Sequence, residues 1–295
     1  MLTRGMTGCL AVMLAGILGC GGLSNGGDRK AAAATQGKDG KAARTENFDP
    51  ANFDRSTTID NEWFPLKPGT RRVWEGTRID DEGDQEDRRA VVTVTDLTKE
   101  IGGVRTAVCW NQDFADGELV ETELIFFAQD KGGVVWHLGQ YPEEHEDGNT
   151  VATPCWIHGI KDGKAGIIMH AQPKLGTPSY SQGFGPSVRW MDRGQVYEMG
   201  QKVTVPYGSY EDVLVIDETT SVKPDSHQLK YYARGVGNIK VGWRGEDKTQ
   251  ETLELVKVEK LSAEELAKVR DEVLNLEKNA YELSKDVYAQ TAPTQ

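Results

Sequence analysis

Apolar and polar residues alternate in five segments between residues 70 and 140, and this period of two restricts the fold more than any other feature. The predicted strands are 71–79, 88–97, 103–111, 118–128 and 133–138. Turn-forming residues join them, as in Asp-Asp-Glu-Gly at 80–83 and Asp-Lys-Gly-Gly at 130–133. Because no connection is long enough for a crossover helix, the pattern predicts an antiparallel sheet.

A second series of strands is predicted at 200–206, 210–222, 228–234, 238–243 and 250–258. Residues 124–136 align without a gap on residues 229–241 and share the pattern L-x-[FY]-[FY]-A-[QR]-x-x-G-x-[VI]. Two β-hairpins can also resemble each other by chance. If the segments are duplicated, the two halves complete one core. We therefore expect a mainly β (α+β) fold: a curved antiparallel sheet or partial barrel built from two related meanders, with a C-terminal helix.

The C-terminal segment 261–289 changes to a helical pattern. Ser262 and Glu265 have the spacing of a capping box. From Leu266 to Val287, apolar residues recur in alternating steps of three and four, which gives one narrow seam. The seam predicts a helix that covers one face of the sheet. A helix that pairs with a second copy of the chain is the alternative.

The N-terminus carries an export signal. In residues 1–19 only Arg4 is charged, and the apolar stretch from Leu10 to Leu18 is too short to span a bilayer, which takes about 20 residues. The segment Ile17-Leu18-Gly19-Cys20 resembles a bacterial lipobox, which implies cleavage before Cys20 and acylation of its thiol and amine. An ordinary signal peptide followed by a chance cysteine is the alternative.

Residues 20–46 form a predicted flexible tether after the lipidated Cys20, since residues 21–46 contain one Leu and no aromatic residue. The β domain follows at 47–260, with an insertion at 140–195. A net charge of −12 argues against a nucleic-acid partner. We expect a bacterial cell-envelope protein held at a membrane by the acyl chains on Cys20. Gly21 differs from the Asp of inner-membrane retention signals, so we favour the outer membrane, at its periplasmic or surface face.

Cys109 and Cys155 are the remaining cysteines of the expected mature chain. Outside the cytoplasm such a pair is usually oxidised, which predicts a disulfide that fastens the insertion to the first half of the sheet. Two buried free thiols are the alternative.

The insertion 140–195 and its border are rich in aromatic residues. They supply more apolar surface than a short loop can bury on itself, so they either cover the sheet as a lid or line a binding site. The candidate ligand-binding residues are Trp136, Tyr141, Trp156, Tyr180, Phe184 and Trp190. We expect a binding module for an apolar ligand or an envelope protein.

No nucleophile elbow, zincin, phosphate-loop or C-x-x-C motif occurs in the sequence, so we predict no catalytic residue, no metal site and no cofactor. One alternative remains an envelope hydrolase that uses His and carboxylate side chains of the insertion. Its candidates are the acidic loop Glu143–Asp147, which includes His145, together with His137, His158 and His170. A purely structural envelope module is the other alternative.

Three segments carry a resemblance: the run from Ile59-Asp60-Asn61 to Pro68-Gly69-Thr70, then Asp116-Gly117-Glu118-Leu119-Val120-Glu121, then Lys230-Tyr231-Tyr232-Ala233-Arg234-Gly235-Val236-Gly237. Over residues 50–260 the chain resembles a family of bacterial secreted proteins and lipoproteins that has no established function. The resemblance implies an envelope protein and transfers no catalytic residue. The chain departs from the family at Trp190-Met191-Asp192-Arg193, where a more acidic stretch is expected.

Overall fold

The computed structural model describes residues 44–295, so the signal peptide, Cys20 and most of the tether lie outside the described residues. It contains a 15-stranded sheet and one α-helix, which confirms the mainly β fold with a C-terminal helix. The first meander has strands β1 (Thr70–Ile79), β2 (Gln85–Ile101), β3 (Val104–Ala115), β4 (Glu118–Gln129) and β5 (Val135–Glu146). The insertion has strands β6 (Asn149–Ala152), β7 (Trp156–Ile157), β8 (Lys164–Met169), β9 (Tyr180–Ser181) and β10 (Gly183–Phe184). The second meander has strands β11 (Asp192–Val205), β12 (Gly208–Thr220), β13 (Lys223–Ala233), β14 (Gly237–Gly245) and β15 (Thr252–Lys260), and helix α1 (Ala263–Leu283) follows.

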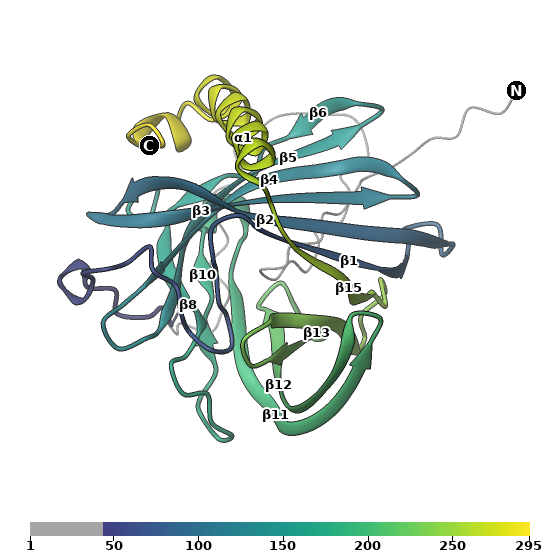
Figure 1. Cartoon of the computed structure of the whole chain (residues 1–295). Coiled ribbons are helices and arrows are strands. Elements are labelled where there is room, and N and C mark those ends of the chain that lie inside the picture. The colour runs from purple at the N-terminus through teal and green to yellow at the C-terminus, as the bar shows by residue number, and fades with distance from the viewer. Residues whose placement is uncertain (1–43) are drawn as a thin grey trace, which may run out of the picture.

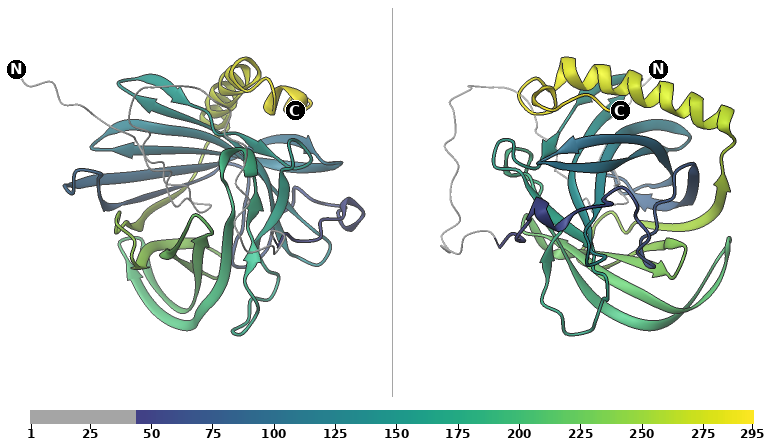
Figure 2. Two further views of the ribbon diagram at one scale, coloured as in Figure 1. Left: turned by 180° about the vertical axis from the view of Figure 1, so that it is seen from behind. Right: turned by 60° about the vertical axis from the view of Figure 1, so that its left-hand side comes forward.

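The two meanders join where β1 pairs with β15, so that one antiparallel sheet runs through both. Figures 1 and 2 show the second meander curling beneath the first. The sheet is not closed, because β8 and β11 do not pair among the described strands. Instead, Tyr180 and Ser181 of β9 pair with β11, and Gly183 and Phe184 of β10 pair with β8. One short segment of the insertion therefore borders both ends of the sheet.

The two hairpins with the shared sequence pattern, β4–β5 and β13–β14, lie at the same place in the meanders β2–β5 and β11–β14. Phe127 and Tyr232 occupy equivalent positions of the pattern, and both are buried in the interior core. Phe64 lies between them, with ring centroids 5.3 Å and 6.3 Å away. The connecting turns differ in length, since 130–134 is longer than 234–236.

The sheet has a buried core on each face. The interior core fills the curve of the sheet with inward residues such as Val92, Ile125 and Val213, and the segment Ile59–Leu66 packs into it. The outer core lies on the other face of the first meander, beneath α1, and includes Val108 and Phe126 of the sheet together with Val273 of the helix. Both arise from the period of two, which sends alternate side chains of one strand to opposite faces.

Helix α1 begins with the predicted capping box. The Ser262 hydroxyl accepts from the Glu265 backbone N–H, and the Glu265 carboxylate accepts from the Ser262 backbone N–H at 2.8 Å. Val269, Val273, Leu276 and Ala280 of the predicted seam are buried against the sheet. Within residues 44–295, no helix has the length and apolarity that crossing a membrane requires.

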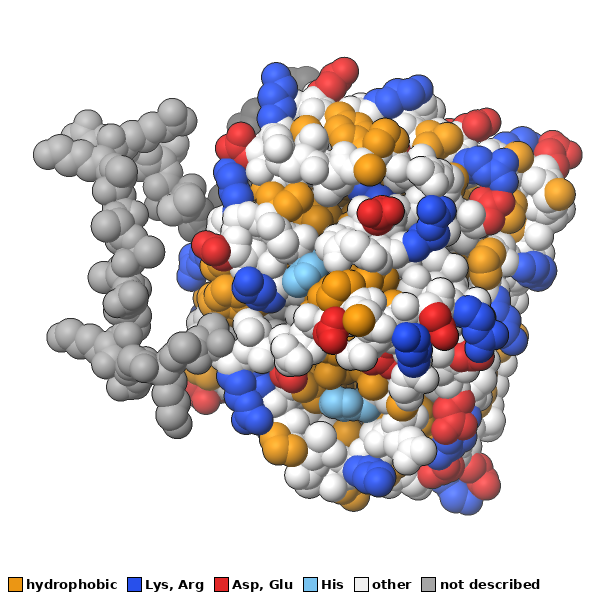
Figure 3. Space-filling view, turned by 90° about the vertical axis from the view of Figure 1, so that its left-hand side faces the viewer, with side chains coloured by type: hydrophobic (Ala, Val, Ile, Leu, Met, Phe, Trp, Pro, Cys, Tyr) orange, Lys and Arg blue, Asp and Glu red, His pale blue; other side chains and the backbone are white. Residues whose placement is uncertain are grey.

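The apolar side chains that reach the surface are dispersed. On the side shown in Figure 3 they emerge in several patches between charged and polar groups. The large exposed apolar residues come from separate strands, from loops and from the end of α1: Leu119, Val151, Leu175, Tyr197, Tyr207, Trp243 and Leu283.

The predicted disulfide is wrong, because Cys109 and Cys155 are both buried free thiols. Cys109 points into the interior core, whereas Cys155 lies in the outer core. A disulfide requires Cβ atoms about 3.5–4.5 Å apart, and here the sheet separates the two side chains. Burial raises the pKa of each thiol to about 12, so neither is a thiolate at neutral pH.

Candidate functional site

A small apolar cavity of about 50 Å³ lies in the interior core. Strands β1–β4 form its walls, and the segment 64–66 and the first residues of β14 complete it. The apolar residues of the lining come from the strands and from the segment 64–66: Phe64, Pro65, Leu66, Val92, Ile125 and Phe127. Alternate strand residues reach it because Arg72 pairs with Val92, and Cys109 with Ile125, across the same face.

Three buried polar side chains belong to the lining of this cavity. Arg72, Trp74 and Asn238 are 8%, 2% and 7% exposed. Within residues 44–295, Arg72 Nε, Trp74 Nε1 and Asn238 Oδ1 have no hydrogen-bond partner. Buried polar atoms are usually hydrogen-bonded, and these three belong to residues that line one cavity, which makes the cavity a candidate place for a ligand or for water.

Arg72 has one hydrogen bond to the protein, from Nη2 to the Pro65 carbonyl at 2.9 Å. Burial lowers the pKa of Arg72, and the groups that oppose this effect are the Cys109 thiol and the Tyr207 hydroxyl. Guanidinium groups stay protonated in proteins, so Arg72 is a buried cation. Among the described side chains no carboxylate forms an ion pair with it. Buried charges are usually paired, which makes Arg72 exceptional.

A row of buried acids adjoins the cavity on the same face. Asp113 lies between Ala90 of β2 and Glu121 of β4, and Glu123 pairs with Asn111 one row closer to the cavity. In the part of the chain that the structure describes, neither oxygen of Glu121 or Glu123 has a partner. Burial first, and neighbouring acids second, raise the pKa of both groups well above the usual value. For Asp113, burial raises the pKa to about 7 although Arg88 lowers it. At neutral pH the row therefore holds protons.

The six predicted aromatic residues lie in three places. Trp136 and Tyr141 belong to the outer core, not to the interior. Trp136 packs edge-on against Phe48 at 5.4 Å. The Tyr141 hydroxyl donates to Glu143 at 2.8 Å. These two side chains do not contribute to the interior cavity.

Trp156 and Trp190 form a second aromatic group, stacked with centroids 6.1 Å apart. The ring of His137 contacts Trp156 at 4.9 Å, and burial lowers the His137 pKa to about 4, so this imidazole is neutral. Packing is tight here, because a Cβ on Gly185 would lie 2.6 Å from Trp156 Cγ. The arrangement favours the lid interpretation of the insertion.

Tyr180 and Phe184 lie in the short strands that border the sheet ends. Tyr180 is buried with its ring 4.5 Å from His170, and Phe184 is half-buried. Neither lines the interior cavity.

The histidines and acids proposed for a hydrolase do not assemble. His145 lies beside Thr150 at 3.4 Å, and His158 Nδ1 accepts from the Ala165 backbone N–H at 3.0 Å. Across residues 44–295, no group of three or more His, Cys, Asp or Glu side chains is placed to hold a metal ion.

Sequence reasoning missed Arg72, Trp74, Asn238 and the acid row. A signal was present, because Glu121 and Glu123 have the same parity on their strand as Ile125 and Phe127. Two acids on the apolar face of a strand mark a polar interior. Asn238 carried no such signal, since it follows a turn.

Comparison with known proteins assigns no family. No protein-family model matches the chain, and no curated protein matches it. Two solved structures are similar to it. One is a protein classed as exported, with a YmcC-like fold, from Bacteroides fragilis, with 13% identity over 67% of this chain and 99% of that chain and a TM-score of 0.39. The other is a protein classed as a lipoprotein from Parabacteroides distasonis, with 10% identity over 70% of this chain and 100% of that chain and a TM-score of 0.36. These similarities are too low to support a function.

Proposed function

We propose that the chain is a membrane-anchored lipoprotein of the bacterial envelope whose folded body binds a small apolar ligand in the interior cavity. The observation that carries the proposal is an apolar cavity whose lining includes three buried side chains, each with a polar atom that has no hydrogen-bond partner among residues 44–295. Apolar walls with a few placed polar groups are typical of ligand sites.

The membrane anchor rests on the sequence before the described residues. The lipobox-like segment ending at Cys20 and the polar tether after it support acylation, and two or three acyl chains hold a protein firmly at a bilayer. Metabolic labelling with a fatty-acid analogue should mark the wild-type protein. Equal labelling of Cys20→Ala would refute the anchor without affecting the cavity.

The size of the cavity limits the ligand. Each water molecule that a cavity holds takes about 10–15 Å³ of the cavity's volume. The cavity of about 50 Å³ therefore admits a ligand of roughly four to six non-hydrogen atoms. Very small ligands gain at most about 1.5 kcal/mol per atom, which sets the tightest dissociation constant on the order of micromolar. A whole acyl chain or an envelope protein does not fit, so we favour a small ligand over those partners.

Xenon is a suitable first probe, because it enters apolar cavities without any polar contact. Xenon NMR on the chain from residue 21 onward, which keeps every described residue, should detect saturable binding. Cys109→Met should abolish this binding, because the longer side chain fills the cavity. Cys155→Ala changes the other buried thiol, outside the cavity, and should leave binding intact. Absence of binding to the wild type, or binding that persists in Cys109→Met, would refute the proposal.

A further inference from the structure

We infer that the ligand of the interior cavity is a short aliphatic carboxylate, and that its carboxylate is the missing counter-charge of Arg72. This inference rests on the proposed function, since it names the class of ligand for the same cavity.

The first argument is the contrast between Arg72 and the other buried cations. Arg88 has Glu86 at 3.4 Å and Glu251 at 3.9 Å. Lys99 has Glu277 at 2.8 Å. Arg72 is also buried, yet within residues 44–295 its side chain hydrogen-bonds only to the Pro65 carbonyl and has no carboxylate partner. Leaving such a charge without an anion is unfavourable, and an anionic ligand would remove the penalty.

The second argument is the chemistry of the polar side chains in the cavity wall. Arg72 Nε and Trp74 Nε1 are both donors, and they lie two residues apart on the same face of β1. Carboxylate oxygens accept such bonds, and those from a guanidinium are among the strongest in proteins. Asn238 adds one acceptor from the second meander, which suits a ligand hydroxyl or a water molecule.

The third argument is the apolar wall opposite these donors. Val92, Ile125 and Phe127 offer no polar side-chain atom to a hydrated inorganic anion. They suit a short alkyl group, which gains free energy on leaving water. A carboxylate with three or four carbons meets both requirements within the available volume.

The acid row does not supply the counter-charge. Arg72 and Glu123 are separated by three strand spacings along the row that runs through Val92 and Asn111, or about 14 Å between backbones. In addition, burial raises the pKa of Glu123 well above its usual value. The counter-charge of Arg72 therefore has to come from a bound ligand.

The test compares isobutyrate with isobutanol and isobutylamine, which share one isopropyl group and differ in the polar end. Calorimetric titration at pH 7, using the chain from residue 21 onward, should show isobutyrate binding about 10- to 100-fold more tightly than the alcohol, with the amine weakest. Chloride at the same concentration should not displace isobutyrate. Displacement by chloride would show a simple anion site and overturn the inference.

Two variants assign the effect to one guanidinium. Arg72→Met should reduce the preference for isobutyrate over the alcohol to about 1-fold. Arg71→Met is the matched control, since Arg71 points to the opposite face, pairs with Glu259 at 3.6 Å and should keep the full preference. Should Arg72→Met not fold, Arg72→Lys keeps the charge and should retain a reduced preference.

The outcomes separate the inference from the proposed function. Equal wild-type affinity for the acid and the alcohol would overturn the inference while xenon and alcohol binding still support the cavity as a site. If xenon and all three compounds fail to bind, the proposed function fails as well.

Discussion

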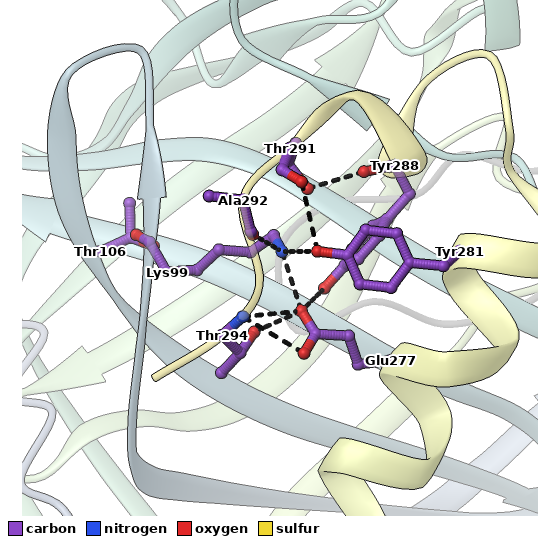
Figure 4. Close-up of polar contacts among 8 residues, drawn as sticks. All are labelled: Lys99, Thr106, Glu277, Tyr281, Tyr288, Thr291, Ala292 and Thr294. Carbon is purple, nitrogen blue, oxygen red and sulfur yellow. Dashed lines mark hydrogen bonds and ion pairs between the residues drawn. The ribbon is translucent and has the colours of Figure 1, made fainter.

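Lys99 and Arg72 are both buried cations on strands of the first meander, and they lie in opposite settings. In the outer core, Lys99 donates to Glu277 at 2.8 Å, to the Ala292 carbonyl at 2.6 Å and to the Tyr281 hydroxyl at 3.3 Å (Figure 4). All three ammonium donors are used. In the interior core, Arg72 has one carbonyl partner and an Nε atom without one among the described residues.

The difference distinguishes a structural ion pair from a candidate site. Burial alone would raise the pKa of Glu277, but hydrogen bonds from Lys99 and Thr294 hold it below the usual value. Glu277 is therefore an ionised carboxylate that neutralises the charge of Lys99. The pair fastens the C-terminal residues to β2, where Gln295 and Thr98 exchange two backbone hydrogen bonds of 2.8 Å. No comparable partner within residues 44–295 fixes Arg72, so we assign it to ligand binding.

The largest expected effect on stability comes from removing Lys99 in the outer core. Lys99→Met should lower the free energy of unfolding by about 3–5 kcal/mol, because it leaves Glu277 buried without its cation. Urea denaturation monitored by tryptophan fluorescence measures this change. The double variant Lys99→Met with Glu277→Gln should recover part of the loss. A single variant within about 1 kcal/mol of the wild type would show that the network is not structural.

The buried acids beside the cavity should make the free energy of unfolding depend on pH. Buried Glu121 and Glu123 have raised pKa values, so the folded state keeps protons that the unfolded state releases. Stability should therefore fall as pH rises, by about 1.4 kcal/mol per pH unit for each retained proton. The window is pH 6.5–8, because below it the histidines with lowered pKa values, such as His137, act in the opposite direction.

Urea denaturation at several pH values between 6.5 and 8 tests this dependence. Glu123→Gln removes one titrating group while keeping its shape, and should flatten the slope. An unfolding free energy of the wild type that is constant or rises across this window would contradict the proposed protonation of the acid row.

Replacing each of the two buried cysteines by methionine compares how tightly the two cores are packed. Cys109→Met fills the interior cavity and should stabilise the protein by about 0.5–2 kcal/mol. Cys155→Met places the same side chain in the outer core, where overpacking should destabilise by about 1–3 kcal/mol. Thermal unfolding of both variants measures the difference. Similar destabilisation by both would mean that the interior is as tightly packed as the outer core.

Sequence periodicity predicted the sheet, the capping box and the seam of α1, because these depend on local spacing. It did not predict which cysteine faces which core, and the expected disulfide failed for that reason. Arg71 and Arg72 are adjacent and chemically identical. Only the register of β1 shows that Arg72 faces the interior core and Arg71 the opposite face. The site therefore depends on strand parity and on the curl of the second meander, which bring Asn238 to Arg72.

The free energy of unfolding of Arg72→Met, measured without any ligand, tests the central claim most directly. If Arg72 is a ligand-binding cation that has no carboxylate partner among residues 44–295, its removal should leave stability unchanged or raise it by up to about 1 kcal/mol. A loss of about 3 kcal/mol or more, as expected for Lys99→Met, would show that Arg72 is a structural residue and would contradict the account.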